Sequence, residues 1–420
     1  MLSKNIALYH NLKSGGSKRE LFEFTKRMKL EGNIVSVYTH EPEKGKYLDL
    51  TDLINDVFVS DYKKLKNISF TLPFFKSILN LVIDVLNIHR LKKVSKSMAS
   101  KIDKNNYDFV FVHHNKDYVQ SPFILKYLKT RTVYFCAEPM RVFYDASMYR
   151  MLKIHLERRT NAILRIYTFI TDLVDRPCKK ILSNKIKKHD FENIQYCDLV
   201  LTNSCYSRER ILAAYGKESK VVYLGGDSLN ATDDSYPNEP PKKENIVVSV
   251  GAINPLKGYD FIVETLGKVN KHIRPTLVII GNAVNLEYMS FLERLAKTNK
   301  VKINIKSNLS DCELSRYIRQ AKIFLYAPYL EPLGLAPLEA MALGTPVIAV
   351  KEGGPRETIK DQYNGLLVER DSKLFTEAIT LLLQSPDEQA RLAKNAFDDI
   401  QNYWNWNAAY NRLTAAIKIA

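Results

Sequence analysis

Cysteine is scarce in this chain, and its few cysteines follow no spacing typical of a disulfide framework. Cys136, Cys178, Cys197, Cys205 and Cys312 are scattered and form no CxxC pair. An odd, unpatterned set of this kind indicates reduced thiols in a cytosolic setting, most of them serving as small core hydrophobes. The sequence therefore gives no reason to expect a domain held together by disulfides.

Long apolar runs are also missing. A membrane-spanning helix needs roughly 18 uninterrupted apolar residues. The nearest candidate, FFKSILNLVIDVLNIHRLKK at 74–93, is broken by Lys76 and Asp84. The opening MLSKNIALYHNL lacks the apolar core of a secretory signal. We expect neither a signal peptide nor a membrane span, and the chain shows no internal repeat or low-complexity tract.

What the chain does have is the composition of a globular protein with more than one domain. Its 420 residues exceed one ordinary hydrophobic core, so two domains are the default expectation. An apolar content of 45% and a charged content of 26% exclude disordered and fibrous classes.

Positive charge is concentrated in the first half of the chain. Residues 1–225 contain 39 Lys and Arg against 23 Asp and Glu, a net charge of +16, whereas residues 226–420 contain 23 of each. This asymmetry predicts that the first half faces an anionic partner such as a lipid surface, nucleic acid or acidic glycan. The alternative is a basic surface that only aids solubility.

Strand-like and helix-like segments alternate along both halves. The opening reads as a strand, a glycine turn and a helix capped by Gly32, and Asn203 or Ser204 suits the start of a later helix. Residues 225–244 are rich in Gly, Asp, Ser and Pro, which is typical of a linker, and the alternation then restarts at NIVVSVGA. Such alternation predicts parallel sheets covered on both faces.

The predicted fold class is α/β, with two Rossmann-like doubly wound domains facing a cleft. The domains expected are an N-terminal Rossmann-like domain at 1–225, a linker at 226–244 and a second Rossmann-like domain at 245–400. The segment 401–420 is expected to form one C-terminal helix that can pack back on the N-terminal domain. Ligands in such sheets bind beyond the carboxyl ends of the strands, so motifs at strand ends matter most.

The stretch YLEPLGLAPLEAMALGTP, at 329–346, places two glutamates in an apolar setting at such a strand end. Pro332 disfavours a helix, so Glu331 is expected on a loop. Pro337 suits the first helical position and would place Glu339 in the first turn. In the interpretations without a ligand, Glu331 is a solvated loop acid and Glu339 complements the helix dipole. The alternative is a ligand site, because carboxylates accept hydrogen bonds from sugar hydroxyls and a helix N-terminus favours phosphate.

The surrounding residues favour the ligand site. The run EPLGLAPLEAMALGTPVIAVKEGGPRE from Glu331 to Glu357 resembles the signature of the large family of retaining GT-B-fold glycosyltransferases known as group 1, which has two glutamates separated by seven residues. The likeness continues in NGLLV at 364–368, VGAINPLKG at 250–258 and the turn at Ser14, Gly15 and Gly16. It spans essentially the whole chain, with several motifs in the family's order.

The resemblance implies a role for each matching position. Gly15 and Gly16 would let the first-domain backbone approach the donor diphosphate, as Gly251 would in the second domain. Lys257 would neutralise the leaving diphosphate. Glu331 would contact the transferred sugar beside the amides of Leu333, Gly334 and Leu335, and Glu339 would bind the ribose hydroxyls. Lys257 and Glu331 are thus the predicted catalytic residues.

The resemblance also implies a retaining, metal-independent transfer. The leaving phosphate oxygen would help to deprotonate the acceptor hydroxyl, and the protein would supply positioning and charge stabilisation. No metal and no cofactor is expected besides the UDP- or GDP-linked sugar used as substrate. The sequence shows no DxD-like or histidine-rich ligand set, and Asp233 and Asp234 lie in the linker.

Two positions depart from the family pattern. Ala252 stands where the family usually has arginine, and Ala137, in the run CAEPMR, stands where it usually has histidine. Candidate replacements are Arg356, Arg141, His113 and His114. His113, His114, Glu138 and Arg141 are therefore candidate residues on the acceptor or sugar side, with structural histidines an equal alternative for the first two.

The segment 150–190 is the most basic part of the first half, with 11 Lys and Arg against 4 Asp and Glu, interleaved with apolar residues. A basic amphipathic helix predicts binding to an anionic membrane surface. The alternative is an ordinary helix that packs on its own domain.

The leading hypothesis is a glycosyltransferase that moves a sugar from a nucleotide-sugar donor to a lipid-linked or cell-surface glycan. The expected location is cytoplasmic and peripheral on the membrane. Nucleic acid is not an expected partner, because the chain contains no known binding module. The alternatives are a degenerate sugar-nucleotide-binding scaffold, suggested by Ala137 and Ala252, and a nucleotide-sugar epimerase.

Overall fold

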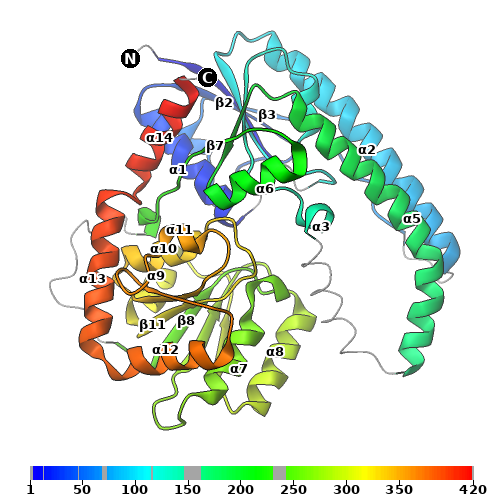
Figure 1. Ribbon diagram of the computed structural model, residues 1–420. Helices are drawn as coiled ribbons and strands as arrows, with labels where there is room; N and C mark the ends of the chain where they lie inside the picture. Colours follow the sequence, from blue (N-terminus) through cyan, green and yellow to red (C-terminus); the bar gives the residue numbers. More distant parts are fainter. Residues whose placement is uncertain are drawn as a thin grey trace. The chain divides into compact units, whose positions relative to one another are not determined.

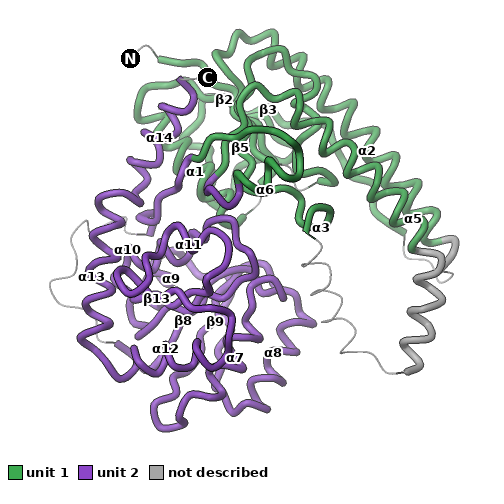
Figure 2. The backbone as a smooth tube through the Cα atoms, viewed as in Figure 1, with its two compact units in different colours: residues 1–202, 208–221, 419–420 green, residues 203–207, 222–418 purple. Residues whose placement is uncertain are grey.

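The computed structural model describes most of the chain as two compact units (Figure 2). Unit 1 comprises residues 1–202, 208–221 and 419–420, and unit 2 comprises residues 203–207 and 222–418. The described ranges are 3–12, 14–45, 47–68, 73–114, 117–145, 162–229 and 243–418, and the side chains of 73–75 and 162–175 are not described.

Unit 1 is built on a parallel sheet that has seven strands among the described residues (Figure 1). Its order is β3-β2-β1-β4-β5-β6-β7, and every neighbouring pair is parallel. The strands are β1 Asn5–Tyr9, β2 Ile34–Thr39, β3 Asp56–Val59, β4 Phe109–His113, β5 Thr132–Phe135, β6 Leu199–Thr202 and β7 Lys220–Val221. The helices are α1 Gly16–Leu30, α2 Pro73–Asp103, α3 Arg141–Tyr144, α5 Ala162–Gln195 and α6 Cys205–Tyr215, of which α6 begins among the residues of unit 2.

The central strands of unit 1 are apolar on both faces, as a parallel sheet covered by helices requires. All residues of β4 and β5 are buried, whereas the edge strand β3 is exposed along its length. The long helices α2 and α5 run side by side (Figure 1).

Local signals at the helix ends of unit 1 match the sequence. Gly15, at φ 90°, precedes α1, and Gly32, at φ 81°, follows its end, so the predicted cap is confirmed. Of the two residues predicted to start α6, Ser204 accepts a hydrogen bond from the Ser207 amide at 3.0 Å.

Unit 2 repeats the same plan with a parallel sheet that has six strands among the described residues. Its order is β10-β9-β8-β11-β12-β13. The strands are β8 Ile246–Val250, β9 Thr276–Ile280, β10 Ile303–Lys306, β11 Ile323–Tyr326, β12 Val347–Val350 and β13 Leu366–Val368. The helices are α7 Tyr259–Lys268, α8 Leu286–Thr298, α9 Asp311–Gln320, α10 Leu335–Ala342, α11 Pro355–Thr358, α12 Ser372–Gln384, α13 Pro386–Asn402 and α14 Trp406–Lys418. The predicted α/β class with two doubly wound sheets is confirmed, whereas the cleft between the domains stays a prediction.

The C-terminal segment differs from the single helix expected over 401–420. Helix α13 ends at Asn402 and α14 begins at Trp406, within unit 2. The break follows from Asn405, whose side chain accepts a hydrogen bond from the Ala408 amide at 2.8 Å and so starts a new helix.

Two predicted features lie largely beyond the described residues. The linker at 226–244 is described only to residue 229 and again from 243, and the basic segment 150–190 has described side chains only from 176 onward. Within the part of the chain that is described, no helix has the length and apolarity needed to cross a membrane.

Candidate active site

The sheet of unit 2 reverses its strand order between β8 and β11, which lie side by side as parallel neighbours. In a doubly wound sheet, ligands bind beyond the carboxyl ends of the strands at this switch point. The loop after β8 carries Lys257, and the loop after β11 carries Glu331. The two predicted catalytic residues therefore lie on loops at the end of the sheet where its topology favours a ligand.

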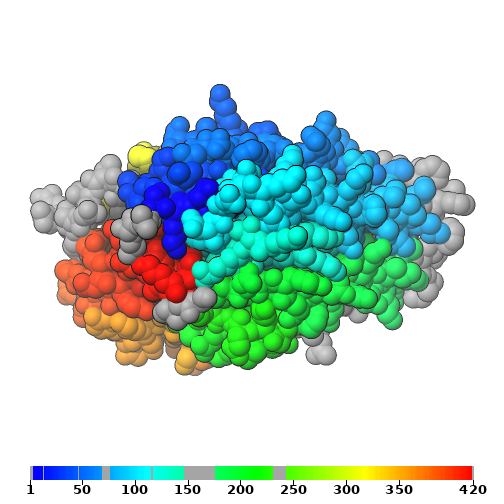
Figure 3. Space-filling view, turned by 90° about the horizontal axis from the view of Figure 1, so that it is seen from above, coloured from blue at the N-terminus to red at the C-terminus, as the bar shows by residue number. Residues whose placement is uncertain are grey.

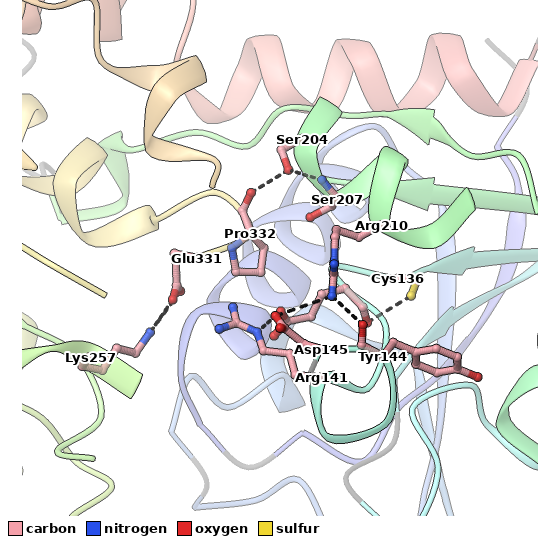
Figure 4. Close-up of polar contacts among 11 residues, drawn as sticks. Cys136, Arg141, Tyr144, Asp145, Ser204, Ser207, Arg210, Lys257, Glu331 and Pro332 are labelled. Carbon is pink, nitrogen blue, oxygen red and sulfur yellow. Dashed lines mark hydrogen bonds and ion pairs between the residues drawn. The ribbon is translucent and has the colours of Figure 1, made fainter. Parts of the chain in front are cut away.

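The side chains of Lys257 and Glu331 meet in a bidentate ion pair (Figure 4). Lys257 Nζ lies 3.0 Å from Glu331 Oε1 and 2.9 Å from Oε2. The two side chains keep 22% and 19% of their surface exposed, so the pair is accessible from solvent. A half-enclosed ammonium that is held by a carboxylate is able to exchange that carboxylate for a phosphate oxygen.

Close backbone contacts hold the two loops against each other. The Tyr329 amide donates to the Leu256 carbonyl at 2.9 Å. Gly258 adopts φ 64°, and a Cβ atom there would lie 2.0 Å from the Ala327 carbonyl oxygen. The glycine after Lys257 is thus required by packing at the strand end.

Arg370 fixes the end of β11, and the sequence analysis did not identify it. Its guanidinium donates to the carbonyls of Ala327 at 3.0 Å and Pro328 at 2.7 Å, and it is paired with Glu352 through Nε at 2.7 Å. It also lies 3.7 Å from the centre of the Tyr329 ring. No local motif marks an arginine so far along the chain from the loop it orders.

Two adjacent glycines, Gly353 and Gly354, support the Glu331 loop from its other side. The Gly354 amide donates to the Glu331 carbonyl at 2.8 Å. A Cβ atom added at Gly353 would lie 2.4 Å from the Glu331 carbonyl oxygen. One added at Gly354 would lie 2.1 Å from the Pro332 carbonyl oxygen. The Gly-Gly pair of the sequence motif therefore positions the loop by close approach.

Gly354→Ala is expected to displace the Glu331 loop. Gly354 has an ordinary φ of −65°, so the cost comes from the clash alone, at about 1–3 kcal/mol. We expect turnover to fall about 10- to 100-fold, because small misplacements of reacting groups have effects of this size. Initial rates and the melting temperature of purified variants measure both effects.

Gly216→Ala is the matched control for this substitution. Gly216 has φ 60° but open space around its Cβ position, so alanine there strains the backbone without a clash. Unchanged turnover in Gly354→Ala would contradict a positioning role for the Gly-Gly pair.

Helix α10 begins earlier than expected, which changes the position of Glu339. Gly334, at φ 89°, precedes the first helical residue, Leu335. The prediction that Pro337 occupies the first position and Glu339 the first turn was therefore wrong by two residues, because the left-handed glycine already starts the helix. Glu339 lies in the second turn and is 6% exposed.

This placement weakens the interpretation of Glu339 as a first-turn acid. Its Oε1 accepts a hydrogen bond from Ser228 Oγ at 3.3 Å. Of the amides expected to serve a ligand, Leu333 is 1% exposed, Gly334 is buried and Leu335 is partly exposed. Binding of ribose by Glu339 stays a prediction.

Gly251 and Ala252 follow β8 directly. The Gly251 carbonyl accepts a hydrogen bond from the buried Tyr259 hydroxyl at 2.9 Å. Burial, and after it the charge of Glu331, raises the pKa of Tyr259 above its usual range, so this phenol stays a donor. A Cβ atom at Gly281 would lie 2.0 Å from the Gly251 oxygen, so the turn is tightly packed.

Arg356 is a candidate for the cation missing at Ala252. Its side chain is exposed, and its Nε donates to the Gly353 carbonyl at 3.2 Å. The neighbouring Glu357 carboxylate accepts from the amides of Cys205 and Tyr206, each at 2.8 Å, so it caps the start of α6. Glu357, the last glutamate of the sequence motif, thus has a structural role as a helix cap.

In unit 1, Gly15 and Gly16 stand at the start of α1, after β1. The Gly15 carbonyl accepts from the Lys18 and Arg19 amides at 3.0 and 3.1 Å. A Cβ atom at Gly15 would meet nothing within 4 Å, so the left-handed backbone accounts for this glycine and close packing does not. Approach of a diphosphate to this turn stays a prediction.

The two histidines at the end of β4, His113 in the strand and His114 directly after it, are buried inside unit 1. His113 is 0% exposed and stacks on Phe135 with ring centres 5.7 Å apart, and its Nε2 lies 3.7 Å from Glu20 Oε1. Burial lowers the pKa of His113 and raises that of Glu20, so both groups favour their neutral forms. His114 is 7% exposed. This burial favours the structural interpretation of both histidines.

The remaining candidates of unit 1 follow β5. Arg141 Nε donates to the Glu138 carboxylate, and both side chains stay partly exposed. Nearby, Arg210 donates to the Tyr144 carbonyl at 2.9 Å and lies 3.5 Å from Asp145 (Figure 4). Glu138 and Arg141 thus form one accessible ion pair beside Ala137.

A buried ion pair in unit 1 escaped the sequence analysis. Lys18 and Glu43 form a short contact with exposures of 0% and 1%, and His10 Nε2 lies 3.5 Å from the same carboxylate. From the sequence, a lysine in the first turn of a helix is expected to be exposed. No sequence pattern near Glu43 identifies this loop residue as its partner.

Comparison with known proteins agrees with this architecture. Residues 231–399 match the family model described as Glycosyl transferases group 1. The mouse GDP-Man:Man(3)GlcNAc(2)-PP-Dol alpha-1,2-mannosyltransferase is 26% identical over 223 residues, 49% of this chain and 45% of the relative. A GDP-mannose-dependent alpha-(1-6)-phosphatidylinositol monomannoside mannosyltransferase of Mycobacterium tuberculosis is 26% identical over 51% of this chain and 60% of its own length. The chain spans about half the length of the curated relatives it matches.

Solved structures extend the likeness to both units. Anabaena HepE, solved with UDP and glucose, aligns over 99% of this chain and 100% of its own, with a TM-score of 0.69 and 16% identity. Sucrose-phosphate synthase of Thermosynechococcus elongatus aligns over 99% of this chain and 98% of its own, with a TM-score of 0.70 and 16% identity. At this identity the likeness shows the shared fold, which is the expected GT-B class. Residues 231–399 of this chain are thus similar to the group 1 glycosyl transferases.

Proposed function

We propose that this chain is a retaining glycosyltransferase that moves a sugar from a nucleotide-sugar donor to a lipid-linked or cell-surface glycan. The observation that carries the proposal is the accessible Lys257–Glu331 pair at the switch point of unit 2. The family match over residues 231–399 and the named activities of the relatives support it.

Lys257 binds the donor diphosphate in this proposal. Its ammonium is held by both oxygens of Glu331 in the structure. A diphosphate competes for that ammonium and frees Glu331 to accept hydrogen bonds from the hydroxyls of the transferred sugar. Binding of the donor thus lets Lys257 neutralise the leaving group and leaves the Glu331 carboxylate available to orient the sugar.

The proposed chemistry keeps the anomeric configuration and needs no metal. The departing phosphate oxygen takes the proton of the acceptor hydroxyl as that hydroxyl attacks the same face of the sugar. Lys257 stabilises the negative charge that develops on the diphosphate, and charge stabilisation of this kind is the largest single contribution in many enzymes. Positioning by the two loops supplies the rest.

The donor proposed for the first trial is GDP-mannose, with UDP-linked sugars second. Relatives from mouse and from Mycobacterium tuberculosis carry GDP-mannose in their names, and HepE was solved with UDP-glucose. The names of the same two relatives include a dolichol-linked and a phosphatidylinositol-linked acceptor. We therefore propose a lipid-linked acceptor and a peripheral location on the cytoplasmic face of the membrane.

A melting-temperature screen against GDP- and UDP-linked sugars tests the donor site. A ligand at about 100 times its Kd stabilises the folded state by about 2.7 kcal/mol, which raises the melting temperature by a few degrees. We expect one nucleotide class to give such a shift in the wild type and a much smaller one in Lys257→Ala. The absence of a shift with every nucleotide sugar would contradict the proposal.

A catalytically degenerate scaffold is the second candidate, because Ala252 and Ala137 replace two residues that the family usually has. Both candidates bind donor, but only the enzyme passes the sugar to an acceptor. Incubation of the bound donor with a membrane-lipid extract separates them. Labelled glycolipid supports the transferase, whereas an altered sugar nucleotide formed without acceptor would indicate an epimerase.

A further inference from the structure

An unusual set of apolar side chains is exposed on unit 1, along the first half of α2 and the segment before it. On α2, Ile78, Leu79, Val82 and Leu86 are 39%, 40%, 49% and 48% exposed. Their spacing places them along one side of the helix. The light-blue atoms of this part of the chain lie at the molecular surface (Figure 3).

The segment before α2, which two asparagines hold on a neighbouring side of the helix, carries two more exposed apolar side chains. Leu65 and Ile68 are 37% and 42% exposed. Two asparagines of α2 hold this segment by its backbone. Asn87 accepts from the Leu65 amide at 2.8 Å and donates to the Leu65 carbonyl at 3.0 Å. Asn80 accepts from the Ile68 amide at 2.9 Å and donates to the Ile68 carbonyl at 3.4 Å.

The later asparagine, Asn87, binds the earlier residue of the segment, Leu65, and Asn80 binds Ile68. The segment and α2 therefore run in opposite directions. Asn87 is 0% exposed, and its side chain also donates to the Tyr118 hydroxyl at 3.1 Å. Tyr118 in turn donates to Asp84 at 2.6 Å. The fold thus holds these apolar side chains in solvent through part-buried hydrogen bonds of Asn87 and Tyr118 and exposed ones of Asn80, which indicates that their exposure is built into the structure.

Basic residues predominate around this exposed side, between the flanking Asp61 and Asp84. Residues 62–83 contain four lysines and no aspartate or glutamate. Lys63, Lys64, Lys66 and Lys76 are all exposed, and Lys64 Nζ lies 4.5 Å from the centre of the Tyr118 ring. The nearest acid on α2, Asp84, is engaged by Tyr118.

We propose that these six apolar side chains and four lysines form a docking face for an anionic lipid bilayer. The face comprises Leu65, Ile68, Ile78, Leu79, Val82, Leu86, Lys63, Lys64, Lys66 and Lys76. Apolar side chains enter the boundary of the acyl chains while lysines contact anionic headgroups. A second copy of this chain is a poor occupant, since four lysines would face four lysines. The inference rests on the proposed function in that the acceptor is lipid-linked.

This docking face differs from the segment 150–190 that the sequence favoured for membrane binding. The apolar residues of α2 occur in the run that the sequence analysis considered as a membrane span and rejected because Lys76 and Asp84 break it. Only the structure shows that one side of this run is left in solvent.

Binding of the purified full-length chain to vesicles tests the docking face. The vesicles are phosphatidylcholine alone or phosphatidylcholine with 30% phosphatidylserine, and the readout is the fraction that floats with the lipid. We expect binding to the mixed vesicles only. Lys63→Gln with Lys66→Gln should lower the partition coefficient about 25-fold, at about fivefold per lysine. Leu79→Gln with Val82→Gln should lower it about tenfold or more.

The matched control is Lys26→Gln with Leu30→Gln on α1, which removes one exposed lysine and an apolar side chain that is 76% exposed outside the docking face. We expect this control to float like the wild type. Glutamine is a good helix former, and all the helical positions changed are exposed or at a helix end, so the variants should keep the fold.

The outcomes separate this inference from the proposed function. Flotation of the Leu79→Gln, Val82→Gln variant at the wild-type level overturns the docking face, whatever nucleotides bind. A change in its molar mass by light scattering, with flotation unchanged, assigns the face to a second copy and also overturns the proposal. If vesicle binding follows the expected pattern but no nucleotide sugar shifts the melting temperature, the docking face stands and the proposed function fails.

Discussion

Lys257→Ala is expected to lower the rate of sugar transfer about 100- to 1000-fold while the fold stays intact. Removal of one preorganised group that stabilises transition-state charge costs about 2.7–4 kcal/mol in other enzymes. Lys257 is 22% exposed and is held only by a loop carboxylate among its described hydrogen bonds, so the protein loses little stability with it. Glu331→Ala should reduce transfer to a similar extent, because the sugar loses the carboxylate that orients it.

The two substitutions should differ in what they do to binding. Lys257 contacts the diphosphate in our account, so its loss weakens donor affinity as well as turnover. Glu331→Ala removes the carboxylate that competes with the diphosphate for Lys257, so donor affinity should hold or rise while turnover falls. Release of nucleoside diphosphate from the donor found in the melting screen, with a membrane-lipid extract as acceptor, measures the rates.

Lys351 provides the matched control for Lys257. It also lies in unit 2 after a strand, and it forms an ion pair with Glu369 at 3.5 Å, but both side chains are more than half exposed. Lys351→Ala should retain nearly full activity. Near-normal transfer in Lys257→Ala would remove this residue from the catalytic site.

Lys18→Met is expected to destabilise unit 1 by about 3–5 kcal/mol. Lys18 and Glu43 are 0% and 1% exposed, and the substitution leaves the Glu43 carboxylate buried without its cation. Loss of one partner from a buried ion pair has a cost of this size, because an uncompensated charge stays in a medium of low polarity. Thermal and denaturant unfolding of the purified variant measures the loss.

Two further variants show whether burial causes this effect. Lys18→Met combined with Glu43→Gln removes both charges and should recover much of the lost stability. Lys188→Met breaks the Lys188–Glu192 pair of α5, in which the lysine is 74% exposed, and should cost less than about 1 kcal/mol. Equal losses of unfolding free energy in Lys18→Met and Lys188→Met would show that the buried pair contributes no more to stability than an exposed pair.

Much of the fold could be predicted from local patterns. Continuous apolar runs such as those of β4 and β11 indicate buried parallel strands, and Gly32 and Ser204 mark helix ends through their own backbone preferences. The same logic placed Lys257 and Glu331 at strand ends. Because neighbouring parallel strands end at one edge, their pairing was predictable once the strand order was assumed.

The contacts that the sequence did not predict join residues far apart in the chain. Arg370 reaches back to Ala327, and Lys18 at the start of α1 pairs with Glu43 after β2. Neither partner has a local pattern that distinguishes it from a surface residue. The start of α10 was misplaced because a proline was weighed above the left-handed glycine before it.

Exposure was the hardest property to predict. The apolar residues of α2 have the composition of a core helix, and their solvent-facing side depends on which neighbours the tertiary fold supplies. His113 shows the opposite case, since its place at a strand end left an accessible site and a structural role as equal interpretations, and it is fully buried against Phe135.

The central claim is that the Lys257–Glu331 pair of unit 2 binds the diphosphate of a nucleotide sugar. Calorimetric titration of GDP and UDP into the wild type and Lys257→Ala tests it most directly. Our account predicts that one nucleoside diphosphate binds the wild type and that Lys257→Ala weakens this binding at least about tenfold, which equals 1.4 kcal/mol. Equal affinities in the two proteins, or no binding of either nucleotide to the wild type, would contradict it.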